Sequence, residues 1–384
     1  MVDSSSPACR ACRGQVGQLV LDLGLQPACD RFPAVGVPGP DPAYPLQMWL
    51  CAVCGLAQLS ADSTTPAEPR GTEPAALAEQ ATDAVRRVVK AGLLPSTGTA
   101  AEYSSPHGGS WLGLLSNQGL NRGAGDSPAD VVVDCFGMMH AADQAAALAE
   151  RARRVAEPSG LLLMQYHSLS AIIRRSQWNV LRHGHFAYYS TTVLAAMLAF
   201  HGFRVAKAWQ FELYGGTVLL AAKRETDNGL GPDPSLRPLL AEDARVGVRQ
   251  PDALRGLQRE SGDQSSRLHS WLSAQRSAGR LVLGYGAASR AVALLCKARI
   301  DRSLLPAVAD ASPTKQGLRM PGTDIPIVSV GELVSRRPHA ILLLVPDLRA
   351  EVRAAYPAIE QAGTRWVDTE EVGLLLHRRR SGGL

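Results

Sequence analysis

Apolar residues recur along the middle of this chain in two alternating patterns. Between residues 74 and 94 they return every three or four positions, with Leu77, Ala81 and Val85 on one face, which predicts a helix. Short continuous apolar runs predict buried strands within 129–140, 160–169 and 217–224. Helical segments are expected at 141–156, 191–203 and about 250–278. Strands that alternate with helices indicate an α/β sheet.

A second α/β unit follows after residue 278. Segment 279–298 has the pattern of a strand, a Gly-x-Gly turn at Gly284 and Gly286, and a helix. That turn has two interpretations, nucleotide binding or tight packing of strand against helix. Proline-rich segments at 60–74 and 225–246 have the composition of linkers. We therefore expect three domains, at residues 1–62, 63–245 and 246–384.

Four of the seven cysteines form two Cys-x2-Cys pairs, which are Cys9 with Cys12 and Cys51 with Cys54. Each spacing lets one tight turn present two thiolates to one ion, and two such turns complete a tetrahedral site that suits zinc. Four sulfur ligands leave no open position, so a structural zinc is predicted. Strands at 19–24 and 44–50 are expected in the stretch between the pairs. The alternative is four free thiols.

Composition narrows the class of protein. The 384 residues are 46% hydrophobic and 20% charged, which is typical of a globular chain. Forty Lys and Arg nearly balance 35 Asp and Glu, and the dense basic block is confined to 377–380, so a nucleic-acid partner is not expected. The N-terminus lacks a signal-peptide pattern and no apolar run reaches membrane length, which predicts a cytoplasmic protein without a membrane partner. The oligomeric state is not predicted.

Polar residues follow several predicted strands. In α/β sheets ligands bind beyond the carboxyl ends of the strands, so segments 102–109, 137–140 and 166–168 are expected around one crevice. The first of these, within "EYSSPHGGSW", reads as a strand, a turn and a helix start. A helix N-terminus at such a turn favours an anion or part of a cofactor.

Several motifs together resemble the C-methyltransferases that act on nucleotide-activated deoxysugars in antibiotic pathways. The motifs are "CRAC", "YPLQMWLCAVCGLAQL", "HGHFAYYS", "YGGTVLL", "GYGAASR", "SPTKQG" and "MPGTDIPI". The resemblance covers nearly the whole chain. It implies an α/β protein with a small N-terminal zinc-binding domain, a Rossmann-like methyltransferase domain that uses S-adenosylmethionine, and a C-terminal Rossmann-like α/β domain.

The chain departs from that family at the cofactor loop. The family reads roughly E-x-G-S-N-D-G there, and this chain has Ser, Pro and His at the third, fifth and sixth positions. The resemblance implies cofactor contacts from Glu102, Ser104, Ser105, His107, Gly108 and Gly109. Only eleven residues, 119–129, occupy the place of a strand ending in a ribose-binding acid, a helix and a further strand. The helix after Trp111 is therefore expected to lead directly to the strand at 130–135, in a sheet that lacks two strands and most of the adenosine side of the site.

Three histidines are the candidate catalytic residues. The family has a Tyr-His-Glu-His-Phe run where this chain has Arg182, His183, Gly184, His185 and Phe186. His140 fits a further family histidine after the fourth strand. An imidazole can take a proton from a carbon beside a ketone. On an extended segment His183 and His185 would point the same way, with His185 the first choice as base. Substrate contacts are expected from Arg182, Tyr166 and His167.

These features predict a C-methyltransferase-like enzyme of antibiotic or deoxysugar biosynthesis. Its expected substrate is a small molecule, either a nucleotide-activated keto-sugar or a related intermediate, and its histidines would assist enolisation. One alternative is an isomerase, epimerase or lyase that acts without S-adenosylmethionine. Another is a protein that binds such an intermediate or a protein partner and catalyses nothing.

Overall fold

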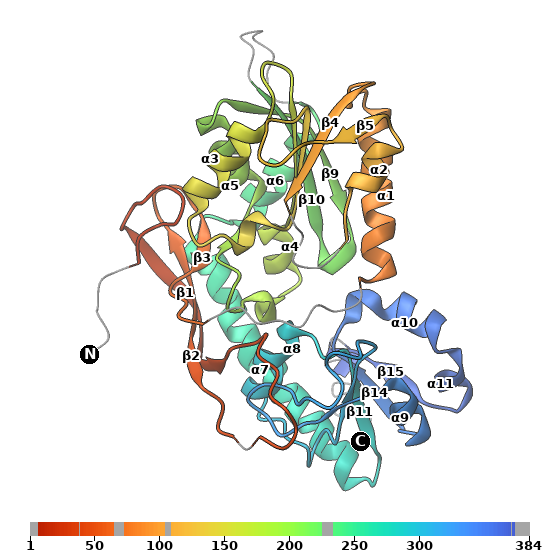
Figure 1. Ribbon diagram of the computed structural model, residues 1–384. Helices are drawn as coiled ribbons and strands as arrows, with labels where there is room; N and C mark the ends of the chain where they lie inside the picture. The colour runs from red at the N-terminus through yellow and green to blue at the C-terminus, as the bar shows by residue number, and fades with distance from the viewer. Residues whose placement is uncertain are drawn as a thin grey trace.

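The computed structural model describes residues 7–37, 39–64, 73–103, 109–224, 233–369 and 371–372. They form three β-sheets, with four, six and five strands. Figure 1 shows the six-stranded central sheet with its helices above the C-terminal sheet, and the N-terminal sheet along one side of both. Within this described part of the chain no helix is long and apolar enough to cross a membrane.

The N-terminal sheet is antiparallel and takes its last strand from far along the chain. Its order is β1 (Gly17–Pro27), β2 (Ala43–Cys51), β3 (Ala57–Leu59) and β8 (Ala187–Tyr188). The strands expected at 19–24 and 44–50 are thus confirmed. β8 follows the histidine segment at 183–185, so the sheet that carries the cysteines also holds that segment.

The central sheet confirms the predicted alternation of strands and helices. The strand order is β5 (Leu120–Arg122), β4 (Gly98–Tyr103), β6 (Val131–Cys135), β7 (Leu161–His167), β10 (Thr217–Arg224) and β9 (Phe203–Phe211). The first four are parallel, and β10 is antiparallel to both of its neighbours. The helices are α1 (Ala75–Lys90), α2 (Leu112–Ser116), α3 (Gln144–Arg154), α4 (Leu169–Arg174), α5 (Thr191–Phe200) and α6 (Leu236–Val246).

One expectation about this sheet is wrong. The link at 119–129 was expected to hold no strand, but it contains β5, which pairs in parallel with the start of β4. Three residues suffice because an edge strand needs only one neighbour, and the side chain of Leu120 is buried against the core. β5 ends at the exposed Arg122, in the stretch where the resemblance implies a strand that ends in an acid. The sheet is shortened, but by less than the sequence suggested.

The C-terminal sheet is parallel, with its first strand at the centre. Its order is β13 (Ile327–Val328), β12 (Val308–Ala309), β11 (Val282–Tyr285), β14 (Ala340–Leu343) and β15 (Arg365–Val367). Its helices are α7 (Pro251–Ser277), α8 (Ser289–Lys297), α9 (Val330–Ser335), α10 (Arg349–Ala355) and α11 (Pro357–Gln361). This is a Rossmann-like order, and its switch point lies between β11 and β14, where such sheets bind ligands.

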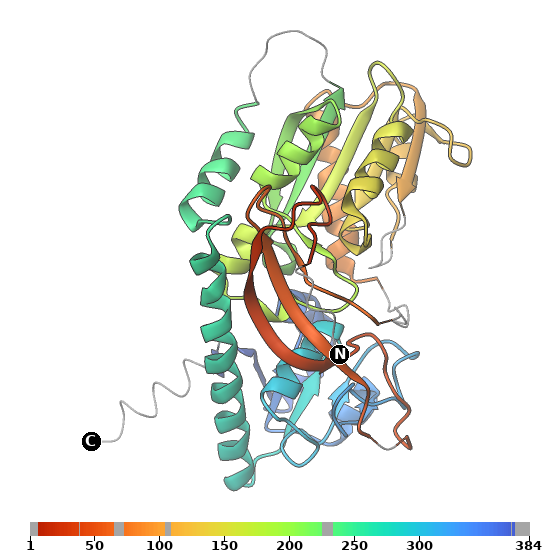
Figure 2. The same cartoon turned by 90° about the vertical axis from the view of Figure 1, so that its left-hand side faces the viewer.

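Polar contacts join the three parts. The Arg319 guanidinium donates to both carboxylate oxygens of Asp41 at 2.7 Å, so the loop after β1 is fastened to the C-terminal part. The Glu351 carboxylate on α10 accepts from the amides of Ala75 and Ala76 at 3.1 Å, and thereby caps α1. Helix α7, the long helix in Figure 2, packs against β1 as well as β11.

Candidate functional site

A cavity of about 350 Å³ lies between the carboxyl edges of the central and C-terminal sheets. Its central wall comes from the ends of β6 and β7, from the segment 180–185 and from the turn before β10. Its other wall is the turn between β11 and α8, together with residues that follow β12 and β14. The polar side chains that line it are Glu73, His167, Arg182, His185, Tyr214, Tyr285, Ser289, Arg290, Asp310, Ser312, Lys315 and Glu351.

Two of the three predicted histidines meet at this cavity. The His185 ring lies edge-on to the His140 ring, with centroids 4.3 Å apart. His185 Nε2 accepts a hydrogen bond from Arg182 Nε at 2.7 Å, and another guanidinium nitrogen of Arg182 contacts Ser289 Oγ on the opposite wall. His185 is a cavity-lining residue, and His140 lies directly behind it. Because Nε2 accepts here, a neutral His185 carries its proton on Nδ1.

The structure places His183 elsewhere. Its Nε2 lies 3.2 Å from the carbonyl oxygen of Pro45, its side chain is 3% exposed, and its ring is edge-on to Tyr44. Gly184 has φ 80°, a left-handed conformation that reverses the local direction between the two histidines. The segment is therefore not extended, and His183 faces the N-terminal sheet while His185 faces the cavity.

His167, expected as a substrate contact, lines the cavity at the end of β7. Burial lowers the pKa of His167 to about 4, against the opposing effect of Asp347. The imidazole is therefore neutral at neutral pH and able to accept a proton. Tyr166 points away, because its hydroxyl is paired with Thr191 Oγ1 at 2.7 Å and its side chain is buried in the core.

Sequence reasoning assigned no role to two aromatic residues in the cavity wall. Phe136 and Tyr214 both have left-handed backbones, with φ 62° and 55°, and their rings meet edge-on at 5.9 Å. Such conformations cost about 1–3 kcal/mol each and cluster at functional sites. Burial raises the pKa of Tyr214 to about 12, so its hydroxyl stays protonated and can donate. For Tyr214, the sequence signal for an unusual turn was the glycine pair that follows it, Gly215 and Gly216.

The C-terminal wall is held by its own hydrogen bonds. Asp310, just after β12, accepts from the amide of Ala287 at 2.7 Å, and Lys315 Nζ donates to the carbonyl of Ala287 at 3.0 Å. Arg290 pairs with Asp347 at 2.6 Å. A Cβ at Gly284 would lie 2.8 Å from Val308, so the first glycine of the Gly-x-Gly turn is required for packing. The turn also lines the cavity through Gly286 and Ala287.

The described part of the predicted cofactor loop is closed on itself. Ser104, Ser105, His107 and Gly108 lie outside the described residues. The Glu102 carboxylate accepts from Ser110 Oγ at 2.6 Å and from the amide of Trp111 at 2.8 Å. Gly109 lies against the Glu73 carboxylate. Since β5 ends in Arg122, the described residues on the adenosine side do not fit the usual site for S-adenosylmethionine.

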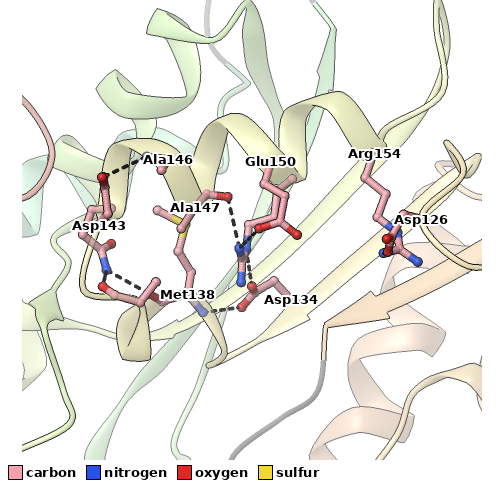
Figure 3. Close-up of polar contacts among 11 residues, drawn as sticks. Asp126, Asp134, Met138, Asp143, Ala146, Ala147, Glu150 and Arg154 are labelled. Carbon is pink, nitrogen blue, oxygen red and sulfur yellow. Dashed lines mark hydrogen bonds and ion pairs between the residues drawn. The ribbon is translucent and has the colours of Figure 1, made fainter.

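An ion pair fixes the end of β6 next to this loop. Asp134 accepts from Arg151 Nε at 2.5 Å and from the amide of Met138 at 2.9 Å, and both charged side chains are buried. Arg151 also lies over the Tyr103 ring, 3.9 Å from its centroid. Figure 3 shows Asp134 beside α3, and Arg154 reaching Asp126 in the link after β5. The two arginines thus tie α3 to the shortened side of the sheet.

The four predicted metal-binding cysteines come together at one end of the N-terminal sheet. All four Sγ atoms lie within 4.8 Å of one another, with Cys9 and Cys54 3.5 Å apart and Cys12 and Cys51 3.6 Å apart. Tetrahedral zinc with Zn–S bonds of 2.3 Å places its sulfurs roughly 3.8 Å apart. The arrangement fits a closed four-thiolate zinc site, in which no coordination position is left for a substrate.

The fold and the cysteine cluster define a Rossmann-like α/β protein with a four-cysteine site that fits zinc. Residues 212–369 match a family model for a C-methyltransferase C-terminal domain, and residues 9–67 match one for a candidate zinc-binding domain. The chain is 26% identical over 196 residues to the C-methyltransferase NovU of Streptomyces niveus, covering 51% of this chain and 46% of that protein. It therefore spans about half the length of this relative. The two family models and this relative support the resemblance of the chain to C-methyltransferases.

Among solved structures, a magnesium protoporphyrin IX methyltransferase from Synechocystis PCC 6803 aligns with 38% of this chain over 83% of its own length. The sequence identity is 14% and the TM-score 0.28. A candidate methyltransferase from Bacillus halodurans aligns with 37% of this chain over 99% of its own length, with 12% identity and a TM-score of 0.28.

Proposed function

We propose that this chain is a C-methyltransferase-like enzyme of antibiotic or deoxysugar biosynthesis that enolises a nucleotide-activated keto-sugar. The observation that carries the proposal is the cavity, where neutral His167, the His185–His140 pair and the protonated Tyr214 face three cationic side chains. Histidines supply the base for a carbon-bound proton, and cations suit a diphosphate. The matches to a C-methyltransferase C-terminal domain and to NovU support the reaction class.

The residues would divide the work as follows. A histidine, with His185 the first choice and His167 the second, removes the proton from the carbon beside the ketone. Tyr214 donates a hydrogen bond to the ketone oxygen as it gains negative charge. Arg182 on the central wall, with Arg290 and Lys315 on the opposite wall, would receive the nucleotide phosphates. The four cysteines would hold one structural zinc, away from these groups.

A second candidate function is isomerisation, epimerisation or elimination without S-adenosylmethionine. The specific support is the adenosine side, where β5 ends in Arg122 and the Glu102 carboxylate is already satisfied by Ser110 and Trp111. Enolisation is the first step of this chemistry as well as of C-methylation. The alternatives therefore differ only in what happens to the enolate.

Deuterium exchange tests the proposal. Thymidine diphosphate 4-keto-6-deoxyglucose incubated with the protein in heavy water should gain one deuterium beside the ketone, measured by mass spectrometry. Replacing the base, His185→Gln, should slow exchange by about 10²–10⁴-fold. His269→Gln is the matched control, because His269 bonds the Ala298 carbonyl and is not among the residues that line the cavity. Absence of exchange by the wild-type protein would contradict the proposal and favour a binding protein.

Calorimetric titration with S-adenosylmethionine then separates the two enzymes. Micromolar binding, followed by a methylated product, identifies methyl transfer. Exchange without such binding identifies cofactor-independent chemistry, and the position of the deuterium reports which carbon reacts.

A further inference from the structure

Arg182 occupies the nitrogen through which His185 would act. Its Nε donates to His185 Nε2 at 2.7 Å, and its terminal nitrogen contacts Ser289 Oγ at the start of α8. The backbone of Arg182 is anchored separately, because its amide donates to the hydroxyl of the buried Tyr188 at 3.1 Å. The guanidinium can therefore change partners by side-chain rotation while the chain stays in place.

This contact blocks the base. A neutral imidazole has one accepting nitrogen, and in His185 that lone pair already receives the Arg182 N–H. The guanidinium only donates this hydrogen bond, because an arginine side chain has no acceptor and does not act as an acid in proteins. His185 Nε2 cannot accept a proton from carbon until Arg182 leaves.

The other cations of the cavity are already engaged. Arg290 is paired with the Asp347 carboxylate at 2.6 Å, and Lys315 donates to the Ala287 carbonyl at 3.0 Å. The partners shown for Arg182 are instead an imidazole and a hydroxyl, neither of which carries a negative charge in its ordinary state. Guanidinium bonds to phosphate are stronger than bonds to neutral acceptors. An entering anion would therefore draw Arg182 more easily than the other two.

We propose that Arg182 is a substrate-operated switch, which covers His185 Nε2 in the empty site and releases it when a phosphate group of the substrate binds the guanidinium. The proposal rests on the proposed function for its substrate class, a nucleoside-diphosphate sugar. It makes Arg182 a positioning residue that confers specificity. A keto-sugar without a diphosphate would enter a site whose base is still covered, and would be enolised more slowly.

The nitrogen resonances of His185 report the switch directly. In protein labelled with ¹⁵N-histidine, saturating inorganic pyrophosphate should move the His185 Nε2 signal toward that of a nitrogen without a hydrogen bond. In Arg182→Met the signal should start there and should not move. Arg175→Met is the matched control, since Arg175 pairs with the exposed Glu212 outside the cavity, and it should behave as wild type. The Nε2 assignment comes from the signal lost in His185→Gln.

Supplying the keto-sugar and the pyrophosphate as separate molecules tests whether phosphate binding at Arg182 controls the rate of deuterium exchange. With free 4-keto-6-deoxyglucose, pyrophosphate should raise the wild-type exchange rate by roughly tenfold or more, the worth of one hydrogen bond to a charged group. In Arg182→Met the free sugar should exchange at a rate that pyrophosphate does not change. Melting curves of the variants confirm that they fold.

The outcomes separate the two proposals. A wild-type His185 signal that pyrophosphate leaves in place, whether or not calorimetry detects binding, would overturn the switch, as would an Arg182→Met signal equal to that of wild type. A response of His185 to pyrophosphate, in a protein that exchanges no proton of the intact nucleotide sugar, would instead preserve the switch and remove the proposed enolisation.

Discussion

Removing the charge of Asp134 should destabilise the protein strongly. Asp134→Asn keeps the shape of the side chain and its acceptor for the Met138 amide, but leaves the Arg151 guanidinium only the half-exposed Glu150 carboxylate, 3.9 Å away, as a counter-ion. The two side chains are 1% and 7% exposed and their atoms lie 2.5 Å apart, so water cannot replace the lost carboxylate. Breaking such a buried pair costs about 3–5 kcal/mol. Because Arg151 keeps its bond to the Ala147 carbonyl and its place over Tyr103, we expect about 3 kcal/mol.

Urea denaturation followed by circular dichroism measures this loss as a lower midpoint at unchanged slope. Asp83→Asn is the control, because Asp83 pairs with Arg86 on the exposed face of α1 and the expected loss is about 0–1 kcal/mol. Combining Asp134→Asn with Arg151→Met should recover part of the stability, since no unpaired charge then remains. A single variant within about 1 kcal/mol of wild type would refute the claim that the pair is shielded from water.

Three further predictions concern the metal site and the histidines. Purified protein should contain about one zinc per chain by elemental analysis, and stripping it with a chelator should lower the melting temperature; a fully folded metal-free protein would disprove the site. The fold depresses the pKa of His167, so its contribution to stability is complete above pH 6.5 and is lost as the pH falls toward about 4. In His167→Gln, the free energy of unfolding measured with urea should therefore fall less steeply as the pH is lowered over that range, by up to about 1.4 kcal/mol per pH unit. A pH dependence equal to that of wild type would contradict the assignment. His183→Gln should lower the free energy of unfolding by about 0.5–1.5 kcal/mol, because the hydrogen bond to Pro45 is lost. A large fall in deuterium exchange without loss of folded protein would instead indicate that His183 takes part in the reaction.

Local patterns explain how much of the fold could be predicted. The apolar runs at 160–169 and 217–224 correspond to β7 and β10, and the helix expected at about 250–278 corresponds to α7. These elements follow from residues close together in the sequence. β5 and β8 were missed because each has only two or three residues, and such strands exist through pairing with a distant neighbour rather than through a periodic pattern.

The candidate site shows the same limit. The four-cysteine site could be predicted from the spacing of the cysteines, because each Cys-x2-Cys pair lies within a few residues of sequence. The separation of His183 from His185 could not, since it depends on the left-handed turn at Gly184 and on a carbonyl supplied by β2. Nor does the sequence reveal that Arg182 would reach Ser289, which lies 107 positions further along the chain. Those contacts are fixed by how two sheets face each other.

The pairing of β8 with β3 has a consequence for recombination between relatives. Gln58 and Ala57 of the N-terminal sheet pair with Ala187 and Tyr188, and the Leu59 amide bonds the Phe186 carbonyl immediately after His185. A chimera that exchanges the first sixty residues for those of another family member would replace the template on which the base is aligned. Such exchanges should succeed only when the 183–190 segment travels with the donor, so the two segments are expected to be inherited as one block although more than a hundred residues separate them.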